Sequence, residues 1–344
     1  FKIEGEYIKR HPEYKMQDRL LLEKIDYKKG TVNIDGKDYI LNDKNFPTID
    51  PKDPYRLTEE EREIMHRLKE SFKNSESLQR HINFLYAKGS LYKCFNSNLL
   101  FHGCIPMEQN GDFSKIDIYG NTLSGKKYLD YIEGLVNKAY IEKDKYKKDR
   151  NALDIMWYLW CGAESPLFGK SKAATFERYL LDDIEENKEV RKEPKNPYYT
   201  LVQQEETCDK IFEEFGLDIK KSHIINGHIP VKEKDGESPI KANGKLLVID
   251  GGFAKSYRKE TGRAGYTLTY NSYGLILAAN EPFDSKMKAI REEQDIKYDV
   301  MVNAKETERK RVADTDIGKS IQEDIEGLKM LLDAYRSGKI KEIM

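Results

Sequence analysis

The sequence predicts a mixed α/β protein, with helices in its first half and a strand-rich section in its second half. Two observations support this fold class. Apolar residues recur at helical spacing in several stretches before residue 162, and four short apolar runs follow one another between residues 223 and 278. Short loops separate these runs, so we expect them to lie in one sheet or sandwich. At 344 residues, the chain is long enough for one large domain or two smaller ones.

The first half of the chain combines weakly and strongly patterned segments. Residues 1–50 are irregular and polar, apart from a hairpin predicted over 31–41, where apolar runs flank Asp35-Gly36. Thr58 followed by Glu61 is a capping-box pattern that predicts a helix over 58–75. Apolar spacing further predicts a helix over 78–88, a strand at 98–103 that stops at His-Gly, and helices over 127–142 and 150–161.

The second half begins with a charged, proline-containing segment at 182–198, which we interpret as a solvated loop. Strands are predicted at 223–226, 245–250, 265–270 and 273–278. From residue 285 the chain is ionic again, and it closes with a helix whose apolar stripe comprises Ile317, Ile321, Ile325, Leu328, Leu332 and Tyr335. These patterns predict three sections: a hairpin and helical segment at 1–90, a central section at 91–283 and a charged helical extension at 284–344.

The composition argues against several classes of partner. Charged residues make up 35% of the chain, but their signs nearly cancel to a net charge of −1, so nucleic acid and acidic membranes are not expected as partners. No run approaches the roughly 18 apolar residues of a membrane span. The four cysteines form no Cys-x-x-Cys pair, which favours free thiols and a cytoplasmic location.

Two of the six histidines stand where a predicted strand meets a glycine-flanked turn. They are His102, followed by Gly103, and His228, preceded by Gly227, and an Ile-Pro pair follows each site. A strand end holds a side chain rigidly yet leaves it exposed, and imidazole is a common ligand for divalent metals. The alternative is that both histidines are satisfied by backbone hydrogen bonds. We interpret the other four histidines as structural, since they lack adjacent glycines.

Two further segments carry residues suited to binding. One is a strand that ends in Asp250-Gly-Gly, which could cradle an anion or orient a metal-binding histidine, or could be a flexible turn. The other is the loop from Cys161 to Lys172, whose Gly-Lys-Ser is not a P-loop because no glycine stands five positions before Gly169. This basic, glycine-flanked loop fits a sugar-phosphate site or a surface turn.

Motifs in this sequence resemble those of a known family. Two short ones, His102-Gly103 and Gly227-His228, match the last two motifs of calcineurin-like phosphatases. The surrounding residues are more specific, and together they resemble the class III fructose-1,6-bisphosphatases of Gram-positive bacteria from about residue 30 to near the C-terminus. They include Asn98-Leu-Leu-Phe-His-Gly-Cys-Ile-Pro, Leu167-Phe-Gly-Lys, Lys195-Asn-Pro-Tyr-Tyr, Ile224-Ile-Asn-Gly-His-Ile-Pro-Val-Lys and Ile249-Asp-Gly-Gly-Phe-Ala-Lys.

The resemblance implies a fold, a reaction and a set of site residues. The fold would be the C-terminal half of a calcineurin-like four-layer sandwich, in which two facing mixed sheets are flanked by helices. The reaction would be hydrolysis of fructose 1,6-bisphosphate to fructose 6-phosphate and phosphate in gluconeogenesis, by an enzyme expected to be a homo-oligomer. His102 and His228 would bind one ion of a dinuclear manganese site, supported by Asn226 and Asp250. The substrate phosphates would contact Lys170, Arg178, Lys241 and Lys255.

One departure limits the resemblance. The sequence contains no Asp-x-His, Gly-Asp-x-x-Asp or Gly-Asn-His motif, so the bridging carboxylate, the remaining metal ligands and the catalytic acid are absent. We therefore expect the chain alone to be inactive and an N-terminal half to be missing, which the lack of an initial methionine also indicates. Two alternatives stay open: a calcineurin-like phosphatase for another phosphoester, and a non-catalytic assembly module that associates through helices at 58–88 and 316–336.

Overall fold

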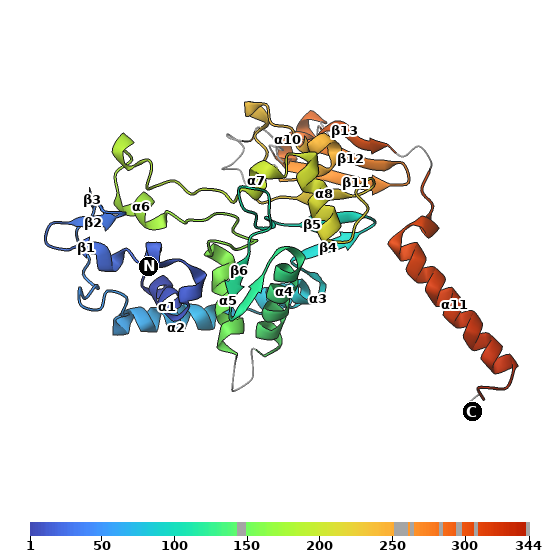
Figure 1. Ribbon diagram of the computed structural model, residues 1–344, viewed down its shortest axis with the longest axis horizontal. Coiled ribbons are helices and arrows are strands. Elements are labelled where there is room, and N and C mark those ends of the chain that lie inside the picture. Colours follow the sequence, from blue (N-terminus) through green and yellow to red (C-terminus); the bar gives the residue numbers. More distant parts are fainter. Residues whose placement is uncertain are drawn as a thin grey trace. The chain divides into compact units, whose positions relative to one another are not determined.

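The computed structural model describes residues 1–142, 149–250, 261, 265–281, 285–293, 298–305 and 309–341 (Figure 1). The side chains of residues 302–305 are not part of this description. The chain forms two compact units, called unit 1 (1–92 and 102–201) and unit 2 (93–101 and 202–344). Each contains helices and sheets, which confirms the mixed α/β class. The predicted boundaries at residues 90 and 283 stay a prediction.

Unit 1 begins with a folded segment that the sequence prediction missed. Residues 1–50, expected to be irregular, contain α1 and three short 3-10 turns, and they bury Ile8, Met16 and Leu21. Charged residues interrupt the apolar ones here, so no clear period is visible in the sequence. The predicted hairpin is confirmed as part of a three-stranded antiparallel sheet. The elements are α1 (Lys2–Arg10), β1 (Ile25–Asp26), β2 (Thr31–Ile34) and β3 (Lys37–Ile40).

Two predicted helices follow, and both are confirmed as α2 (Glu59–Lys73) and α3 (Glu76–Lys88). Thr58 accepts a hydrogen bond from the backbone of Glu61, whose carboxylate accepts one from the backbone of Thr58, so the capping box is present. Neither helix contains a buried residue. The apolar stripe of α2 is therefore exposed, with Phe72 63% accessible.

The core of unit 1 is built around a pair of helices. The elements are β6 (Ile116–Ile118), β7 (Asn121–Leu123), α4 (Gly125–Ile141), α5 (Arg150–Cys161), α6 (Thr175–Leu180) and α7 (Tyr198–Leu201). Helix α4 packs on α5 and buries Tyr128 and Ile132, while α5 buries Ile155 and Tyr158. The segment at 182–198, predicted as a loop, contains one 3-10 turn and an isolated bridge from Lys195 to Lys170, and α7 begins at Tyr198.

Unit 2 contains a five-stranded sheet with the order β4-β5-β8-β10-β9. The middle strands β5, β8 and β10 are parallel, with Leu99 opposite Ile224 and Ile224 opposite Leu246. Strand β9 runs antiparallel to β10. The elements are β4 (Tyr92–Phe95), β5 (Asn98–Phe101), α8 (Glu205–Glu214), β8 (His223–Asn226), β9 (Ile240–Lys241) and β10 (Leu246–Val248).

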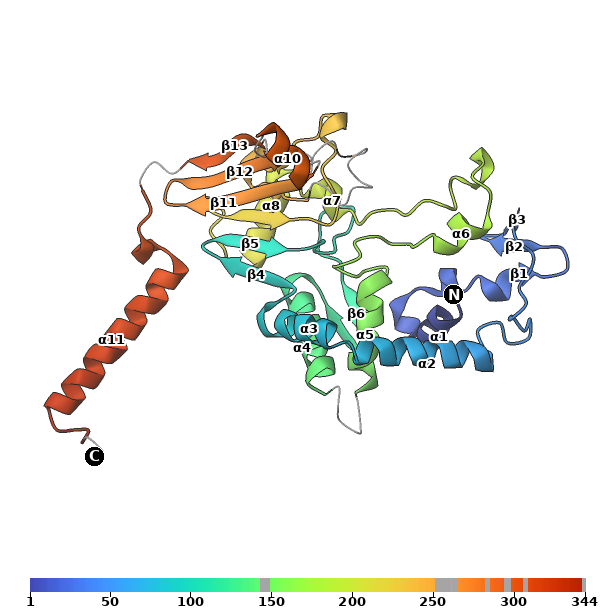
Figure 2. The same ribbon diagram turned by 180° about the vertical axis from the view of Figure 1, so that it is seen from behind.

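A second sheet of unit 2 packs against the first. It consists of β11 (Gly265–Asn271), β12 (Gly274–Asn280) and β13 (Tyr298–Lys305), all antiparallel. Ile225 and Leu247 of the first sheet form one apolar cluster with Leu275 of the second. The four predicted strands therefore occupy two sheets that share a core, which matches the sandwich rather than the single sheet (Figures 1 and 2).

The last part of unit 2 is helical. Helix α10 (Lys286–Glu292) and strand β13 were not predicted, whereas the C-terminal helix is confirmed as α11 (Asp316–Arg336). All four cysteines are among the described residues and form no disulfide, as predicted. Within the described part of the chain, no helix combines the length and apolar character needed to cross a membrane.

Candidate active site at the strand ends

The segments that the sequence singled out follow one edge of the five-stranded sheet. Because β5, β8 and β10 are parallel and in register, their last residues, Phe101, Asn226 and Val248, lie at the same edge. His102 follows the first strand, Gly227-His228 the second and Asp250 the third. Ligands in sheets of this kind bind at the carboxyl ends of the strands. This edge is therefore the candidate functional site of the chain.

The backbone at His228 adopts a conformation that is rare for a residue with a side chain. Its φ angle is +69°, and the amide of Ile229 donates a hydrogen bond to the carbonyl of Gly227 at 2.8 Å. This is a γ-turn of the strained form, centred on the histidine. Strained backbone of this kind persists where surrounding structure holds it, and it gathers at functional sites. Half-buried His228 is thus held in place by its turn.

The supporting residues Asn226 and Asp250 tie this turn to the neighbouring strand. The carbonyl of Asn226 accepts a hydrogen bond from the amide of Ile249 at 2.9 Å. The carbonyl of Asp250 accepts one from the amide of Val231, also at 2.9 Å. The turn that carries His228 is therefore bracketed by two backbone hydrogen bonds. Asn226 is buried and Asp250 is half-buried.

His102 is exposed at the start of a tightly packed segment of unit 1. The amide of Cys104 donates a hydrogen bond to the carbonyl of Pro166 at 2.8 Å, which fixes this segment against the loop from Cys161 to Lys172. Burial raises the pKa of the Cys104 thiol to about 12, so it stays protonated at neutral pH. His102 therefore stays the predicted metal-binding residue of this segment.

The basic loop brings two predicted phosphate-binding residues together on one carboxylate. Lys170 lies 2.7 Å from Glu193 Oε2, and Arg178 lies 3.4 Å from the same atom. Burial tends to raise the pKa of Glu193, but the hydrogen bond from Lys170 and the charge of Arg178 hold it below its usual value. Lys172 pairs with Glu177 at 2.7 Å. All three cations are therefore paired with carboxylates.

The sequence did not reveal Glu193 as the partner of these cations. It lies in the charged segment that we interpreted as a solvated loop, yet its side chain is only 13% exposed. No periodic pattern marks such a residue, because its burial depends on Lys170, which is 23 positions away along the chain. Lys170 and Arg178 would have to exchange this carboxylate for a phosphate in order to bind substrate.

Of the two remaining predicted phosphate-binding residues, only Lys241 is among the described residues. Lys241 on β9 pairs with Leu246, the first residue of β10, so it lies at the opposite end of that short strand from Val248. Lys255 lies outside the described residues. Among the residues that the structure describes, no group of three or more His, Cys, Asp or Glu side chains is arranged to hold a metal ion. His102 and His228 therefore stay predicted metal ligands, and the described residues contain no complete ligand set.

A comparison with known protein families shows which family this sequence matches. A family described as Firmicute fructose-1,6-bisphosphatase matches residues 1–337. The chain belongs to this family. Its membership confirms the resemblance drawn from the motifs around His102 and His228.

Individual relatives of this Firmicute fructose-1,6-bisphosphatase family are similar over nearly the whole chain. A relative named fructose-1,6-bisphosphatase class 3 from Clostridium tetani is 57% identical over 342 residues, which are 99% of this chain and 51% of the relative. One of the same name from Alkaliphilus metalliredigens is 58% identical over 344 residues, with the same two coverages. The chain thus spans about half the length of the curated relatives it matches. No solved structure gives a significant match.

A side chain at Gly103 would collide with the backbone of the loop from Cys161 to Lys172. A Cβ atom there would lie 2.2 Å from the carbonyl oxygen of Pro166. We expect Gly103→Ala to lower the free energy of unfolding in urea by about 1–3 kcal/mol, because the segment must move away from the loop.

The matched control for Gly103→Ala is Gly134→Ala in α4, where a Cβ would meet no atom within 4 Å. Alanine has the higher helix propensity, so this control should raise stability by up to about 1 kcal/mol. Equal effects of the two substitutions would show that the close approach to Pro166 is not a constraint.

Proposed function

We propose that this chain forms part of a metal-dependent fructose-1,6-bisphosphatase, which hydrolyses the 1-phosphate of fructose 1,6-bisphosphate to give fructose 6-phosphate. The observation that carries the proposal is the shared edge of β5, β8 and β10, which the chain leaves through His102 and His228. Family membership supports the substrate. A calcineurin-like sandwich is the proposed fold, and the apolar cluster between the two sheets of unit 2 supports it.

The residues at the strand ends fit part of a metal site. His102 and His228 would hold one ion of a dinuclear centre, with manganese as the proposed metal, since imidazole suits such ions. When bound, the two ions would polarise the phosphate and lower the pKa of a water. Asn226 and Asp250 would orient the turn that carries His228. Lys170 and Arg178 would bind the substrate's phosphates and release Glu193 as they do so.

The chain does not contain every group that this reaction needs. Two imidazoles without a carboxylate cannot offset the repulsion of two divalent ions, and the sequence lacks the three acidic and histidine motifs named above. We propose that a polypeptide carrying those motifs completes the site and contributes the bridging carboxylate and the catalytic acid. The complete enzyme is proposed to be cytoplasmic and homo-oligomeric.

The test is manganese-dependent release of phosphate from fructose 1,6-bisphosphate. The chain alone would be compared with the chain mixed with a polypeptide that carries the missing motifs. We expect activity only in the mixture. Activity toward other phosphoesters but not this sugar bisphosphate would replace the substrate assignment with the broader calcineurin-like one. An inactive mixture that nevertheless forms a complex would contradict the proposed reaction.

A further inference from the structure

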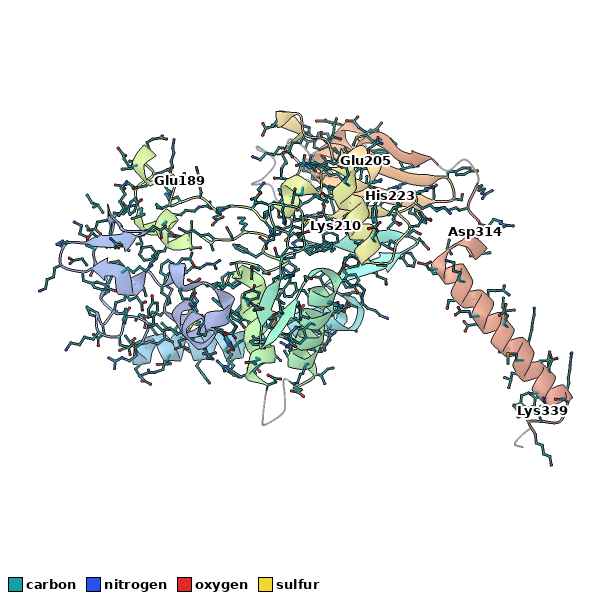
Figure 3. The ribbon with its side chains drawn as sticks, viewed as in Figure 1. Glu189, Glu205, Lys210, His223, Asp314 and Lys339 are labelled. Carbon is teal, nitrogen blue, oxygen red and sulfur yellow. The ribbon has the colours of Figure 1, made fainter. Side chains whose placement is uncertain are left out.

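Helix α11 exposes an apolar stripe along its whole length. The structure describes all of its residues, and Gly318 is the only one that is buried. The large apolar side chains are substantially exposed, including Leu328 at 65% and Ile321 at 48%. A stripe of this kind on a helix normally packs against another element. Asp314 and Lys339, labelled in Figure 3, mark the two ends of this region.

The hydrogen bonds that join α11 to other described residues of unit 2 lie at its first turn. Thr315 caps it by accepting a hydrogen bond from the amide of Gly318. The carboxylate of Asp316 accepts a hydrogen bond from the amide of Asn96 at 2.6 Å, and the side chain of Asn96 accepts one from the amide of Asp316 at 2.9 Å. These contacts fix where the helix begins and leave its apolar stripe uncovered.

The stripe follows the repeat of a coiled coil. From Ile321 to Tyr335 its residues are spaced four, three, four and three apart, which is the alternation of a and d positions in a heptad. Ile325 and Leu332 take the a positions, and Ile321, Leu328 and Tyr335 take the d positions. Isoleucine at a with leucine at d, as in the central heptad, favours a two-stranded coiled coil. The repeat therefore predicts a second helix of the same kind as its partner.

The charges beside the stripe select the orientation of that partner. In this register Asp324 is at position g and Lys329 is at position e of the next heptad. Parallel helices bring such g and e positions of different chains together, so Asp324 would face the partner's Lys329 twice in a symmetric dimer. Antiparallel helices would bring the e positions together, and these carry Gln322, Lys329 and Arg336, so no acidic residue would face the two cations there. The charges thus favour the parallel pair.

We propose that α11 is a dimerisation helix that pairs in parallel with α11 of a second copy of this chain. The pairing would bury the five a and d side chains and form two Asp324–Lys329 ion pairs between the copies. This inference goes beyond the proposed catalytic function and does not depend on it, because self-association is measured by mass rather than by activity.

The test exploits the two-fold symmetry of the pair. The unmodified chain, at low salt, should have about twice its 40.1 kDa chain mass by light scattering. D324K places lysine opposite lysine, and K329D places aspartate opposite aspartate, so each variant alone should dimerise roughly tenfold or more weakly. A mixture of the two variants restores both ion pairs, and its dimer affinity should return to that of the unmodified chain.

The matched control is E323K, which makes the same charge change as D324K at the outer f position of α11. It should leave the dimer mass unchanged. A monomeric unmodified chain would overturn the proposal, and would mean that the stripe packs on its own chain or on another polypeptide. Failure of the mixed variants to recover affinity would overturn the parallel pairing.

Discussion

His228→Ala is expected to lower manganese-dependent phosphatase activity at least about 100-fold. The activity is measured in a mixture of this chain with a polypeptide that carries the Asp-x-His, Gly-Asp-x-x-Asp and Gly-Asn-His motifs. The reason is that His102 would be left as the sole imidazole at the strand ends. Metal content after dialysis should fall in the same variant, because one ion would lose one of its two proposed imidazole ligands. Activity and bound manganese would be measured on the same preparations.

Two further variants separate the loss of the imidazole from other effects of the substitution. Alanine is strained at the positive φ of residue 228, whereas asparagine tolerates this conformation. His228→Asn should therefore keep the turn but still lose metal and activity. His66→Ala, on the exposed surface of α2, should change neither. Unchanged metal content in both His228 variants would show that this histidine is held by its surroundings for a structural reason.

The fold could be predicted from sequence where a short-range signal was strong. The capping box before α2 and the apolar run of β8 located these elements closely, because their signals lie within a few residues. The first 50 residues were misjudged, since α1 buries Lys2 and Gly5 along with Ile8. The buried face of α1 therefore shows no run of apolar residues that would predict a helix from the sequence. Which strands share a sheet also depends on register between distant segments, which no local pattern encodes.

The candidate site shows the same limit. The placement of His102 and His228 at strand ends followed from the glycines beside them, and the parallel strands confirmed that placement. Whether Lys170 offers its charge to a ligand could not be predicted, because that depends on Glu193 in another segment. The strain at His228 was equally hidden, since a positive φ for histidine has no sequence signal comparable to glycine.

Asp154→Ala is expected to be the most destabilising of the substitutions considered, lowering the free energy of unfolding by about 3–5 kcal/mol. The side chain of Asp154 is only 2% exposed on α5. It forms an ion pair with Arg10, contacts His11 Nε2 at 2.9 Å and lies 3.1 Å from Arg150 Nε. Removing this carboxylate leaves two cations and a buried imidazole without their shared acceptor. Denaturation in urea, followed by circular dichroism, would measure the loss.

Asp149→Ala is the control on the same helix. Asp149 caps α5 by accepting a hydrogen bond from the amide of Ala152, and it pairs with Lys138 at a partly exposed position. Loss of a cap costs about 1 kcal/mol, so this variant should be clearly more stable than Asp154→Ala. If the two variants lose the same free energy, burial of the network around Asp154 contributes nothing beyond an ordinary helix cap.

The same carboxylate should make the stability of the protein depend on pH in acid. Burial tends to raise the pKa of Asp154, but the hydrogen bonds from His11 and Arg10 and the charge of Arg150 outweigh it, so the pKa lies below its ordinary value of 3.8. The stabilisation is therefore fully present above pH 3.8 and is lost as the pH falls through the lower folded value. Asp154→Asn cannot titrate, so the difference in unfolding free energy between the two proteins should shrink over that range. Other carboxylates, such as Glu61, are common to both proteins, so their titration cancels in this comparison. If the difference in unfolding free energy stays constant down to pH 2, Asp154 is not the group whose lowered pKa stabilises the protein.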